Sequence, residues 1–250
     1  MEVGRALVTG AGARLGRAMA EALGQAGWAV ALHYNSSAAG AEETEAAITA
    51  AGGRAVPVQA DLSDPGDVAG LMAKARGGLG GEVTLLVNSA STFVEDTLAS
   101  HGPGTWATHF DVNLRAPIAL AQALAAELPG QTPGLVVNII DQRVWKLTPQ
   151  FFTYTLSKSA LWTATRTMAQ ALAPHIRVNA IGPGPTLKSV HQTEAEFAAE
   201  QAATLTGRGA GPGDVTRALL YLIEADAMTG QMLAVDGGQH LLWQTPDVAE

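Results

Sequence analysis

Two side chains four residues apart, Tyr154 and Lys158, form a Tyr-x-x-x-Lys pair within a stretch of helical pattern. On a helix, residues at this spacing share one face. A free tyrosine has a pKa of about 10, and a neighbouring ammonium group favours the phenolate and lowers that pKa. The pair is therefore predicted to supply a proton to a substrate, with Tyr154 as the donor. Taken alone, it also fits a tyrosine and a lysine on a helix surface.

The carboxyl group of Asp141 stands thirteen residues before Tyr154, at the end of a predicted strand. A carboxyl group beside a tyrosine can relay a proton, directly or through water, to a nitrogen that must be protonated on reduction. Asp141 is therefore a candidate catalytic residue. The alternative is that it only orients Tyr154 or caps a neighbouring turn.

A glycine-rich segment, TGAGARLG, joins the first predicted strand to the first predicted helix. Glycine lets the backbone turn sharply and approach a pyrophosphate, and the helix N-terminus offers free N–H groups to it. We expect Gly10, Arg14, Leu15 and Gly16 to bind a dinucleotide cofactor there. The alternative is a tight turn without a ligand.

The end of the second predicted strand bears on the choice of cofactor. NAD-binding sheets usually place an acidic residue there, on the ribose hydroxyls. This strand ends instead in a polar segment without a carboxylate: His33, Tyr34, Asn35, Ser36 and Ser37. Hydroxyls and amides can donate to a 2′-phosphate, and Arg14 adds a cation. We therefore expect NADPH; the alternative is a solvated Arg14 beside an ordinary polar loop.

Further cofactor contacts are expected at the carboxyl ends of other strands, where ligands bind in parallel sheets. They are Asp61 and Leu62 after the third strand, Asn88, Ser89 and Ala90 after the fourth, and Pro183 and Gly184 after the sixth. Asp61 equally fits a cap for the helix expected near Pro65.

Short β-branched runs alternate with alanine-rich helical stretches along the whole chain, the pattern of a parallel sheet flanked by helices. Seven strands are predicted: Arg5–Thr9, Trp28–Tyr34, Arg54–Val58, Val83–Asn88, Leu135–Asp141, Ile176–Ile181 and Gln231–Val235. Six helices are predicted between them: Arg14–Ala26, Ala39–Ala51, Pro65–Arg76, Thr105–Leu128, Phe152–Ala173 and Gly213–Glu224. We expect residues 1–250 to form one α/β domain. The segment Leu187–Thr206 departs from the alternation and is predicted to be an insertion that could cover a site.

Composition excludes several classes of function. The 250 residues carry 15 Lys and Arg against 23 Asp and Glu, a net charge of −8 that disfavours nucleic-acid binding. The chain has no cysteine, which fits a reducing compartment. We see no signal peptide and no apolar run long enough for a membrane span, so a cytoplasmic protein is expected. The six histidines form no metal-binding pattern, and we expect no metal.

The ordered set of motifs resembles the short-chain dehydrogenase/reductase family over essentially the whole chain. It comprises TGAGARLG, NSAS, Asp-Val-Asn at 111–113, YTLSK, RVNAIGPG and VDGG. The resemblance implies a Rossmann-like doubly wound fold with a seven-stranded sheet, a Ser-Tyr-Lys-Asn type of site and a homotetramer. Tyr154, Lys158 and Asn113 match the family's residues, and Asn113 would support a water linked to the lysine.

Two departures from the common family pattern narrow the resemblance. Arg14 stands where most members have glycine, and Asp141 stands where the catalytic serine is usual. Both look like the pteridine reductase branch, which includes bacterial dihydromonapterin reductases, and the segments LHYNSSAA, NSASTF and LAPHIRVNAIGPG agree. Ser36 departs from this branch, since several members carry arginine there.

The branch implies a pterin pocket. Phe93 would stack on the pterin ring, and Ser91, Pro185 and Thr186 would lie near the substrate; the alternative for Phe93 is core packing. We therefore expect an NADPH-dependent pterin reductase. The other hypotheses are a carbonyl or imine reductase of the same family and a dinucleotide-binding sensor without turnover.

Two of the predicted helices indicate that the chain associates with further copies or partners. The helices predicted at Thr105–Leu128 and Phe152–Ala173 are apolar on more than one face, so we expect them to pack against a partner chain as well as the sheet. The apolar segment Gly238–Trp243 fits the same interface.

Overall fold

A seven-stranded parallel sheet forms the centre of the computed structural model, which describes residues 4–189 and 192–245. The strand order is β3-β2-β1-β4-β5-β6-β7, and every neighbouring pair is parallel. The strands are β1 Arg5–Val8, β2 Ala29–Tyr34, β3 Arg54–Gln59, β4 Leu85–Asn88, β5 Gly134–Ile139, β6 Ile176–Pro183 and β7 Met232–Val235. The expected fold class, a Rossmann-like α/β sheet, is confirmed.

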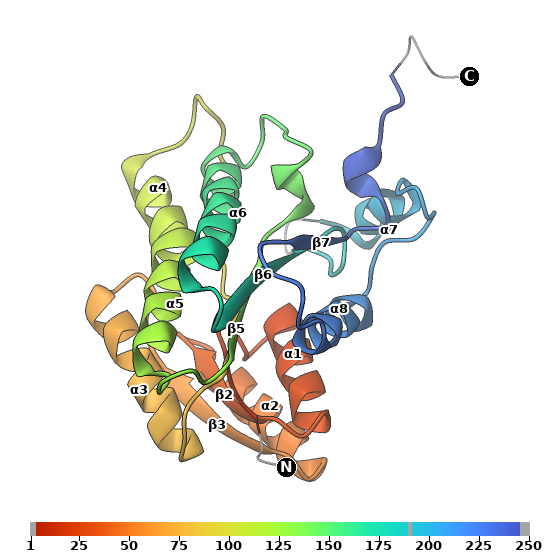
Figure 1. Cartoon of the computed structure of the whole chain (residues 1–250). Helices are drawn as coiled ribbons and strands as arrows, with labels where there is room; N and C mark the ends of the chain where they lie inside the picture. The colour runs from red at the N-terminus through yellow and green to blue at the C-terminus, as the bar shows by residue number, and fades with distance from the viewer. Residues whose placement is uncertain (1–3, 190–191, 246–250) are drawn as a thin grey trace.

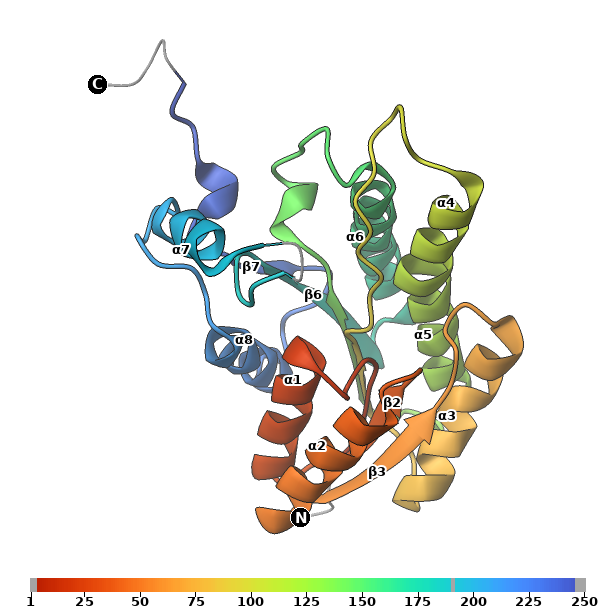
Figure 2. The ribbon, with the colours of Figure 1, turned by 180° about the vertical axis from the view of Figure 1, so that it is seen from behind.

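Helices cover both faces of the sheet (Figures 1 and 2). One face carries α1 Arg14–Gln25, α2 Ala38–Ala50 and α8 Pro212–Glu224. The other carries α3 Pro65–Leu79, α4 Pro103–Phe110, α5 Ala116–Glu127 and α6 Phe152–Leu172. Both faces of the sheet are therefore buried, which explains why its strands read as nearly continuous apolar runs.

The central strands divide their side chains between two apolar cores. Leu85 and Val87 of β4 pack into the core beneath α1 and α8, whereas Leu86 packs into the core beneath α3 and α5. Successive residues of a strand point to opposite faces, so one short run of apolar residues supplies both cores. All three side chains are fully buried, and this fixes the register of β4 between β1 and β5.

The strand order reverses between β1 and β4. The connection after β1 runs to one side of the sheet, and the connection after β4 runs to the other. At such a point the loops at the carboxyl ends diverge and leave a crevice in which ligands bind. The loops after β1, β4, β5 and β6 all open at this edge.

One predicted helix is wrong in its details. The stretch expected as a single helix over Thr105–Leu128 consists of α4, a five-residue π-helix η1 (Asp111–Arg115) and α5. A π turn holds one residue more than α-helical hydrogen bonding accommodates, and nothing in hydrophobic periodicity signals it. Its only buried residue is Asn113.

The segment Leu187–Thr206, expected as an insertion, contains a further helix, α7 (Glu194–Ala202). Thr193 and Glu196 form a capping box at its start, a signal that was readable in the sequence. None of its residues is buried, which explains why no apolar stripe marks it. Residues 190 and 191 lie outside the described part of the chain.

Two short 3-10 helices lie near the same edge, η2 (Gln142–Val144) after β5 and η3 (Gln239–Leu241) after β7. Within residues 4–189 and 192–245, no helix combines the length and apolar character needed to cross a bilayer. In the same ranges, no three histidine or acidic side chains converge as metal ligands would.

Candidate active site

A cavity of about 910 Å³ opens at the carboxyl edge of the sheet. Its wall is built from the loops after β1 to β6, the first turns of α6, and α7. Nearly all the residues predicted for the site line it. Those that do not are Tyr34, Ser36, Ser37, Asn88 and Asn113.

The turn between β1 and α1 forms one end of the cavity. Gly10 has φ +68°, and a Cβ on it would lie 2.9 Å from the Cα of Ala90. A Cβ on Gly16 would overlap the carbonyl oxygen of Gly10. No side chain caps the N-terminus of α1, and its first turn holds no acidic residue. The free N–H groups and positive dipole end fit the pyrophosphate of a dinucleotide.

His33 supports this turn from below. The buried ring accepts a hydrogen bond at Nδ1 from the Gly10 N–H (3.1 Å). Its Nε2 lies 3.1 Å from the carbonyl oxygen of Ala60, which can only accept, so Nε2 carries the proton. Burial lowers the pKa of His33 to about 4 and keeps the ring neutral. His33 therefore ties the ends of β1, β2 and β3 together at the cofactor turn.

Arg14 links the turn to the chain after β6. It adopts the left-handed conformation, with φ +50°. Its guanidinium donates hydrogen bonds to the carbonyl oxygens of Leu187 (3.0 Å) and Lys188 (2.9 Å). A guanidinium has five N–H donors, so further donors remain for phosphate oxygens in the adjoining cavity.

The ends of β2 and β3 form the other part of this wall. Asn35 lines the cavity, and residues 33–37 contain no carboxylate. Asp61 also lines it, while Oδ1 accepts from Ser63 N (2.8 Å) and Ser63 Oγ (2.7 Å). These hydrogen bonds lower the pKa of Asp61. The expected alternative, Asp61 as cap of the next helix, is wrong: Asp64 caps α3.

Tyr154, Asp141 and Lys158 meet at the centre of the cavity. The Tyr154 hydroxyl donates to Asp141 Oδ2 across 3.0 Å, and Asp141 Oδ1 accepts from the N–H of Arg143 (2.8 Å). Lys158 Nζ donates to the carbonyl oxygen of Ile139 (2.8 Å). Tyr154 is 6% and Lys158 2% exposed. The expected i, i+4 geometry on α6 places both side chains on the face turned to the cavity.

The electrostatics of this group differ from the sequence prediction. Burial, followed by the charge of Asp141, raises the pKa of Tyr154 well above its usual value, so the expected lowering by Lys158 is wrong for this arrangement. Burial also raises the pKa of Asp141, and it lowers the pKa of Lys158 to about 8. Desolvation dominates the pKa of Tyr154, while the Lys158 ammonium donates its hydrogen bond to the Ile139 carbonyl. Tyr154 therefore keeps its proton until a substrate draws it away.

Asn113 lies behind the cavity and joins two of its walls. Its Oδ1 accepts from Thr92 N (2.9 Å) and Ser91 Oγ (3.1 Å), and its Nδ2 donates to Thr92 O (3.0 Å) and Ser157 Oγ (3.2 Å). The side chain is fully buried. It fixes the loop after β4 against α6, so its place is structural support rather than the cavity surface.

The other predicted residues outside the wall have separate places. Asn88 is buried between strands, where its Nδ2 donates to Asn138 Oδ1 across 2.9 Å. Tyr34 is half-buried at the end of β2, and Ser36 and Ser37 are exposed. The polar character of a segment does not say which of its side chains turn toward the cavity.

An aromatic stack that includes Phe93 forms the side wall. Its ring lies 4.3 Å from that of Phe151 at an interplanar angle of 10°, and 4.7 Å from that of Tyr154 at 81°. The guanidinium carbon of Arg143 lies 4.9 Å above the Phe151 ring. Phe151 was missed by the sequence analysis. It lies at the N-cap of α6 in a left-handed conformation, outside the helix predicted at Phe152–Ala173, so helical spacing gave no signal for it.

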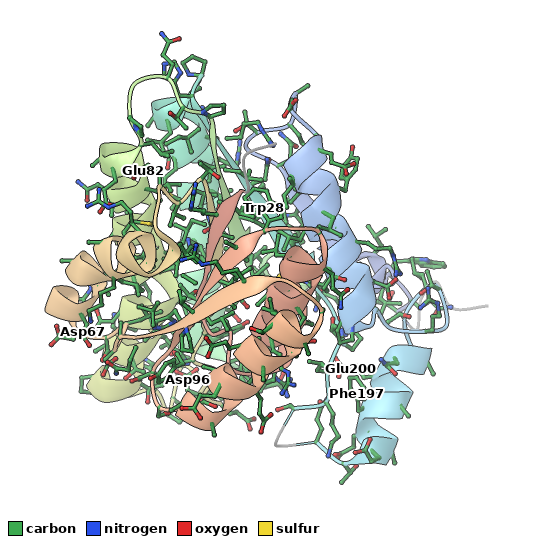
Figure 3. The ribbon with its side chains drawn as sticks, turned by 90° about the horizontal axis from the view of Figure 1, so that it is seen from below. Trp28, Asp67, Glu82, Asp96, Phe197 and Glu200 are labelled. Carbon is green, nitrogen blue, oxygen red and sulfur yellow. The ribbon has the colours of Figure 1, made fainter. Side chains whose placement is uncertain are left out.

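A polar cluster at the outer end of the cavity was also missed. Glu200 accepts hydrogen bonds from Gln192 Nε2 at Oε2 (2.8 Å) and from Gln239 Nε2 at Oε1 (3.0 Å). Glu200 and Phe197 lie on α7, at the edge of the molecule away from α3 (Figure 3), and both line the cavity. Their i, i+3 spacing gives them one helix face, but that face is recognisable only once α7 is known.

Known proteins match this chain over nearly its full length. A family model described as enoyl-(acyl carrier protein) reductase matches residues 10–240. The 3beta-hydroxysteroid dehydrogenase 1 of Eggerthella lenta is 35% identical over 244 residues, which cover 94% of this chain and 93% of that protein.

Two solved structures are more similar. FolM alternative dihydrofolate reductase 1 of Brucella suis, in complex with NADP, superimposes with a TM-score of 0.95 at 50% identity and covers 98% of both chains. The corresponding protein of Brucella canis, complexed with NADP, gives 0.94 at 49%, with 98% of this chain and 97% of that one covered. At this similarity the chain and those reductases share their fold throughout.

Proposed function

This chain belongs to the short-chain dehydrogenase/reductase family, and from that premise we propose that it is an NADPH-dependent reductase acting on a pterin. The observation that carries the proposal is the carboxyl group of Asp141, hydrogen-bonded to Tyr154 inside the cavity. Both reductions consume one hydride and one proton: a carbonyl takes the proton on oxygen, for which a hydroxyl donor suffices, whereas a C=N bond takes it on a ring nitrogen, to which a carboxyl group beside the tyrosine can relay it. The similarity to two FolM proteins of the same fold supports the pterin.

The residues present fit NADPH. The uncapped α1 terminus and the guanidinium of Arg14 would bind its pyrophosphate, and Asn35 at the end of β2 would approach the 2′-phosphate without an acidic repulsion. Lys158 would hold the nicotinamide ribose. When bound, NADPH supplies the hydride.

The chain's own residues then handle the proton. Tyr154 donates its phenolic proton to the substrate nitrogen, so that hydride and proton together saturate one C=N bond. The phenolate is next to Asp141, whose raised pKa favours its protonated form. In that form Asp141 can pass its proton to the phenolate across the same 3.0 Å contact, and it is then reprotonated from solvent, which supplies the one proton that each turnover consumes. The ammonium of Lys158, 5.8 Å from the ring centroid, stabilises the transient phenolate.

The walls of the cavity fit a flat heteroaromatic ring. Phe93 supplies an aromatic surface beside Tyr154, and Ser91, Pro185 and Thr186 line the adjacent surface. An aromatic wall with a few polar groups recognises a planar, hydrogen-bonding bicycle better than an aliphatic ketone.

A substrate panel tests the proposal. Purified protein is given NADPH with dihydropterins, dihydrofolate, biopterin, small ketones and a cyclic imine, and loss of NADPH absorbance is followed. We expect turnover of at least one pterin with kcat/KM well above that of any ketone. Turnover of ketones without turnover of any pterin would overturn the substrate assignment and leave the family assignment intact.

We also infer a homotetramer. Trp106 of α4, Ile118 of α5 and Leu156 of α6 are 40%, 38% and 37% exposed on one side of the molecule. Leu241 and Trp243, near the C-terminal end of the described chain, are 57% and 60% exposed. Apolar surface of this kind marks interfaces. Sedimentation velocity should give a species of four chains, and Ile118→Glu should dissociate it.

A further inference from the structure

A buried polar cluster lies beside the active site but outside its cavity. It consists of Asp96 in the loop after β4, His109 at the end of α4 and Thr153 in the first turn of α6. Their exposed fractions are 4%, 0% and 0%. The proton path proposed above uses none of these three side chains, and none of them lines the cavity.

Hydrogen-bond geometry sets one direction through the cluster. The ring of His109 accepts from Val94 N–H at Nε2 (3.1 Å), so a neutral ring carries its proton on Nδ1. Nδ1 lies 2.7 Å from Thr153 Oγ1 and donates to it. The hydroxyl of Thr153 in turn donates to Asp96 Oδ2. Each donor in the cluster thus has one acceptor, and reversing any of these hydrogen bonds would leave a donor or an acceptor without a partner.

The cluster joins the two chain segments that carry the main cavity side chains. Asp96 accepts from Thr153 N–H at Oδ1 (3.0 Å), and its carbonyl accepts from Phe152 N–H (3.2 Å). The first turn of α6 has no side-chain cap of its own, because Phe151 occupies the N-cap in a left-handed conformation. Asp96 supplies the missing cap and a negative charge at the helix N-terminus.

The residues held by this cluster are the direct neighbours of Phe93 and Tyr154 in the chain. Val94, whose N–H is held by His109, follows Phe93 directly, and Tyr154 follows Thr153 directly. The Phe93 and Tyr154 rings meet edge to face at 4.7 Å, and the His109 ring lies 6.0 Å from Tyr154. A displacement of either segment would change the space between the aromatic wall and the proton donor.

We propose that Asp96, Thr153 and His109 are positioning residues that set the separation between Phe93 and Tyr154 and thereby determine how tightly the substrate ring binds. A buried carboxylate and imidazole cost free energy that apolar side chains of the same size would avoid. Fixing the direction of every hydrogen bond gives a single geometry, which an apolar cluster would not. The inference rests on the proposed pterin substrate for its kinetic readout.

Paired variants separate positioning from general stability. His109→Leu removes both ring nitrogens, whereas His109→Gln keeps an acceptor and a donor at the end of the side chain. Thr153→Val removes the hydroxyl with little change of volume, whereas Thr153→Ser keeps it. The readouts are KM and kcat for the pterin, the Kd of NADPH, and the melting temperature, with kinetics run well below melting.

We expect His109→Leu and Thr153→Val to raise the pterin KM about tenfold, the effect of one lost buried hydrogen bond. The Kd of NADPH should stay within about twofold, because Arg14 and the β1–α1 turn are untouched. His109→Gln and Thr153→Ser should recover most of the pterin KM. An unchanged pterin KM in the folded Leu and Val variants would overturn the proposal, as would equal losses for the pterin and NADPH.

Amide hydrogen exchange gives a readout that needs no substrate. The peptide covering residues 92–96 should exchange faster in His109→Leu than in the wild type, and at the wild-type rate in His109→Gln. If the wild type turns over no pterin, the proposed function fails. The hydrogen-exchange rates alone then test whether the cluster holds the loop in place. Equal exchange in all three proteins would reject the cluster as a device that holds this loop.

Discussion

The hydroxyl of Tyr154 donates a hydrogen bond to Asp141 Oδ2 across 3.0 Å, within a cavity wall that desolvates both groups. The two residues come from different elements, α6 and the turn after β5, and the N–H of Arg143 fixes the second carboxylate oxygen. The proton on Tyr154 is therefore positioned for transfer to a group bound in the cavity, and it is replaced from solvent after each turnover. The first two predictions follow from this pair.

Replacing Tyr154 by phenylalanine should reduce kcat by about 10²–10⁴-fold, the usual contribution of a positioned general acid. The aromatic contact with Phe93 remains, so the pterin KM should change little. Stopped-flow measurement of NADPH oxidation gives kcat, and fluorescence titration gives the Kd of NADPH, which should stay within about twofold. Wild-type turnover in this variant would dismiss Tyr154 as the donor. If the wild type binds NADPH but turns over none of the substrates, the protein would instead be a dinucleotide-binding sensor.

Replacing Asp141 by asparagine should lower kcat for the pterin by about 10²-fold, because an amide cannot return a proton to the Tyr154 phenolate. The amide oxygen can still accept from Arg143 N–H, and the amide NH2 then faces the Tyr154 hydroxyl oxygen, which can accept, so the fold should be retained. Asp141→Ser, which restores the hydroxyl usual in the family, should lose pterin reduction to a similar extent. If Asp141→Asn retains full pterin turnover, the carboxyl group only orients its neighbours.

Replacing Asn35 by aspartate should exchange the cofactor preference. Asn35 lines the cavity at the end of β2, where a carboxylate would repel a 2′-phosphate and accept hydrogen bonds from a ribose diol. We expect kcat/KM for NADPH to fall at least about tenfold and that for NADH to rise. Asn35→Ser, which adds no charge, is the matched control and should keep the NADPH preference. Equal use of both cofactors by the wild type would contradict the 2′-phosphate assignment.

Acid should destabilise the protein through His33. Its pKa is about 4 in the fold and about 6.5 in an unfolded chain, so between these values the unfolded state binds more protons. The stabilisation is therefore complete above pH 6.5 and is lost as the pH falls toward 4, by about 3 kcal/mol in total. Urea unfolding at closely spaced pH values measures this slope.

A variant pair isolates the contribution of His33. His33→Gln removes the titrating ring and should flatten the dependence between pH 6.5 and 4, at a lower overall stability. His175→Gln is the matched control, because it makes the same substitution at an exposed histidine. Identical slopes in the wild type and in His33→Gln would show that other groups dominate acid unfolding.

Much of this site could be predicted because its chemistry lies in short, local patterns. Tyr154 and Lys158 share a face through helical spacing alone. Gly10 lies at a strand-to-helix turn whose positive φ favours glycine. The strands were recognisable since burial of both faces makes them apolar throughout.

What the sequence did not reveal depends on tertiary contacts. The stacking of Phe151 on Phe93 joins residues far apart in the chain, and Glu200 reaches the cavity from a helix that buries nothing. The direction of the Tyr154 pKa shift depends on how completely the fold removes water from the phenol. No local sequence pattern shows which distant residues come into contact or how far the Tyr154 phenol is removed from water.

The π-helical turn at Asp111–Arg115 makes the length of this segment as important as its composition. The π turn holds one residue more than α-helical hydrogen bonding accommodates, so losing a residue would let it return to an α turn. Deleting one residue from the turn would therefore swing Asn113 away from Thr92 and Ser157, with which it now shares hydrogen bonds. Deletion of a single residue should be tolerated worse here than most substitutions on the outer face of α5. The number of residues between α4 and α5 is therefore constrained at this turn, independently of their identity.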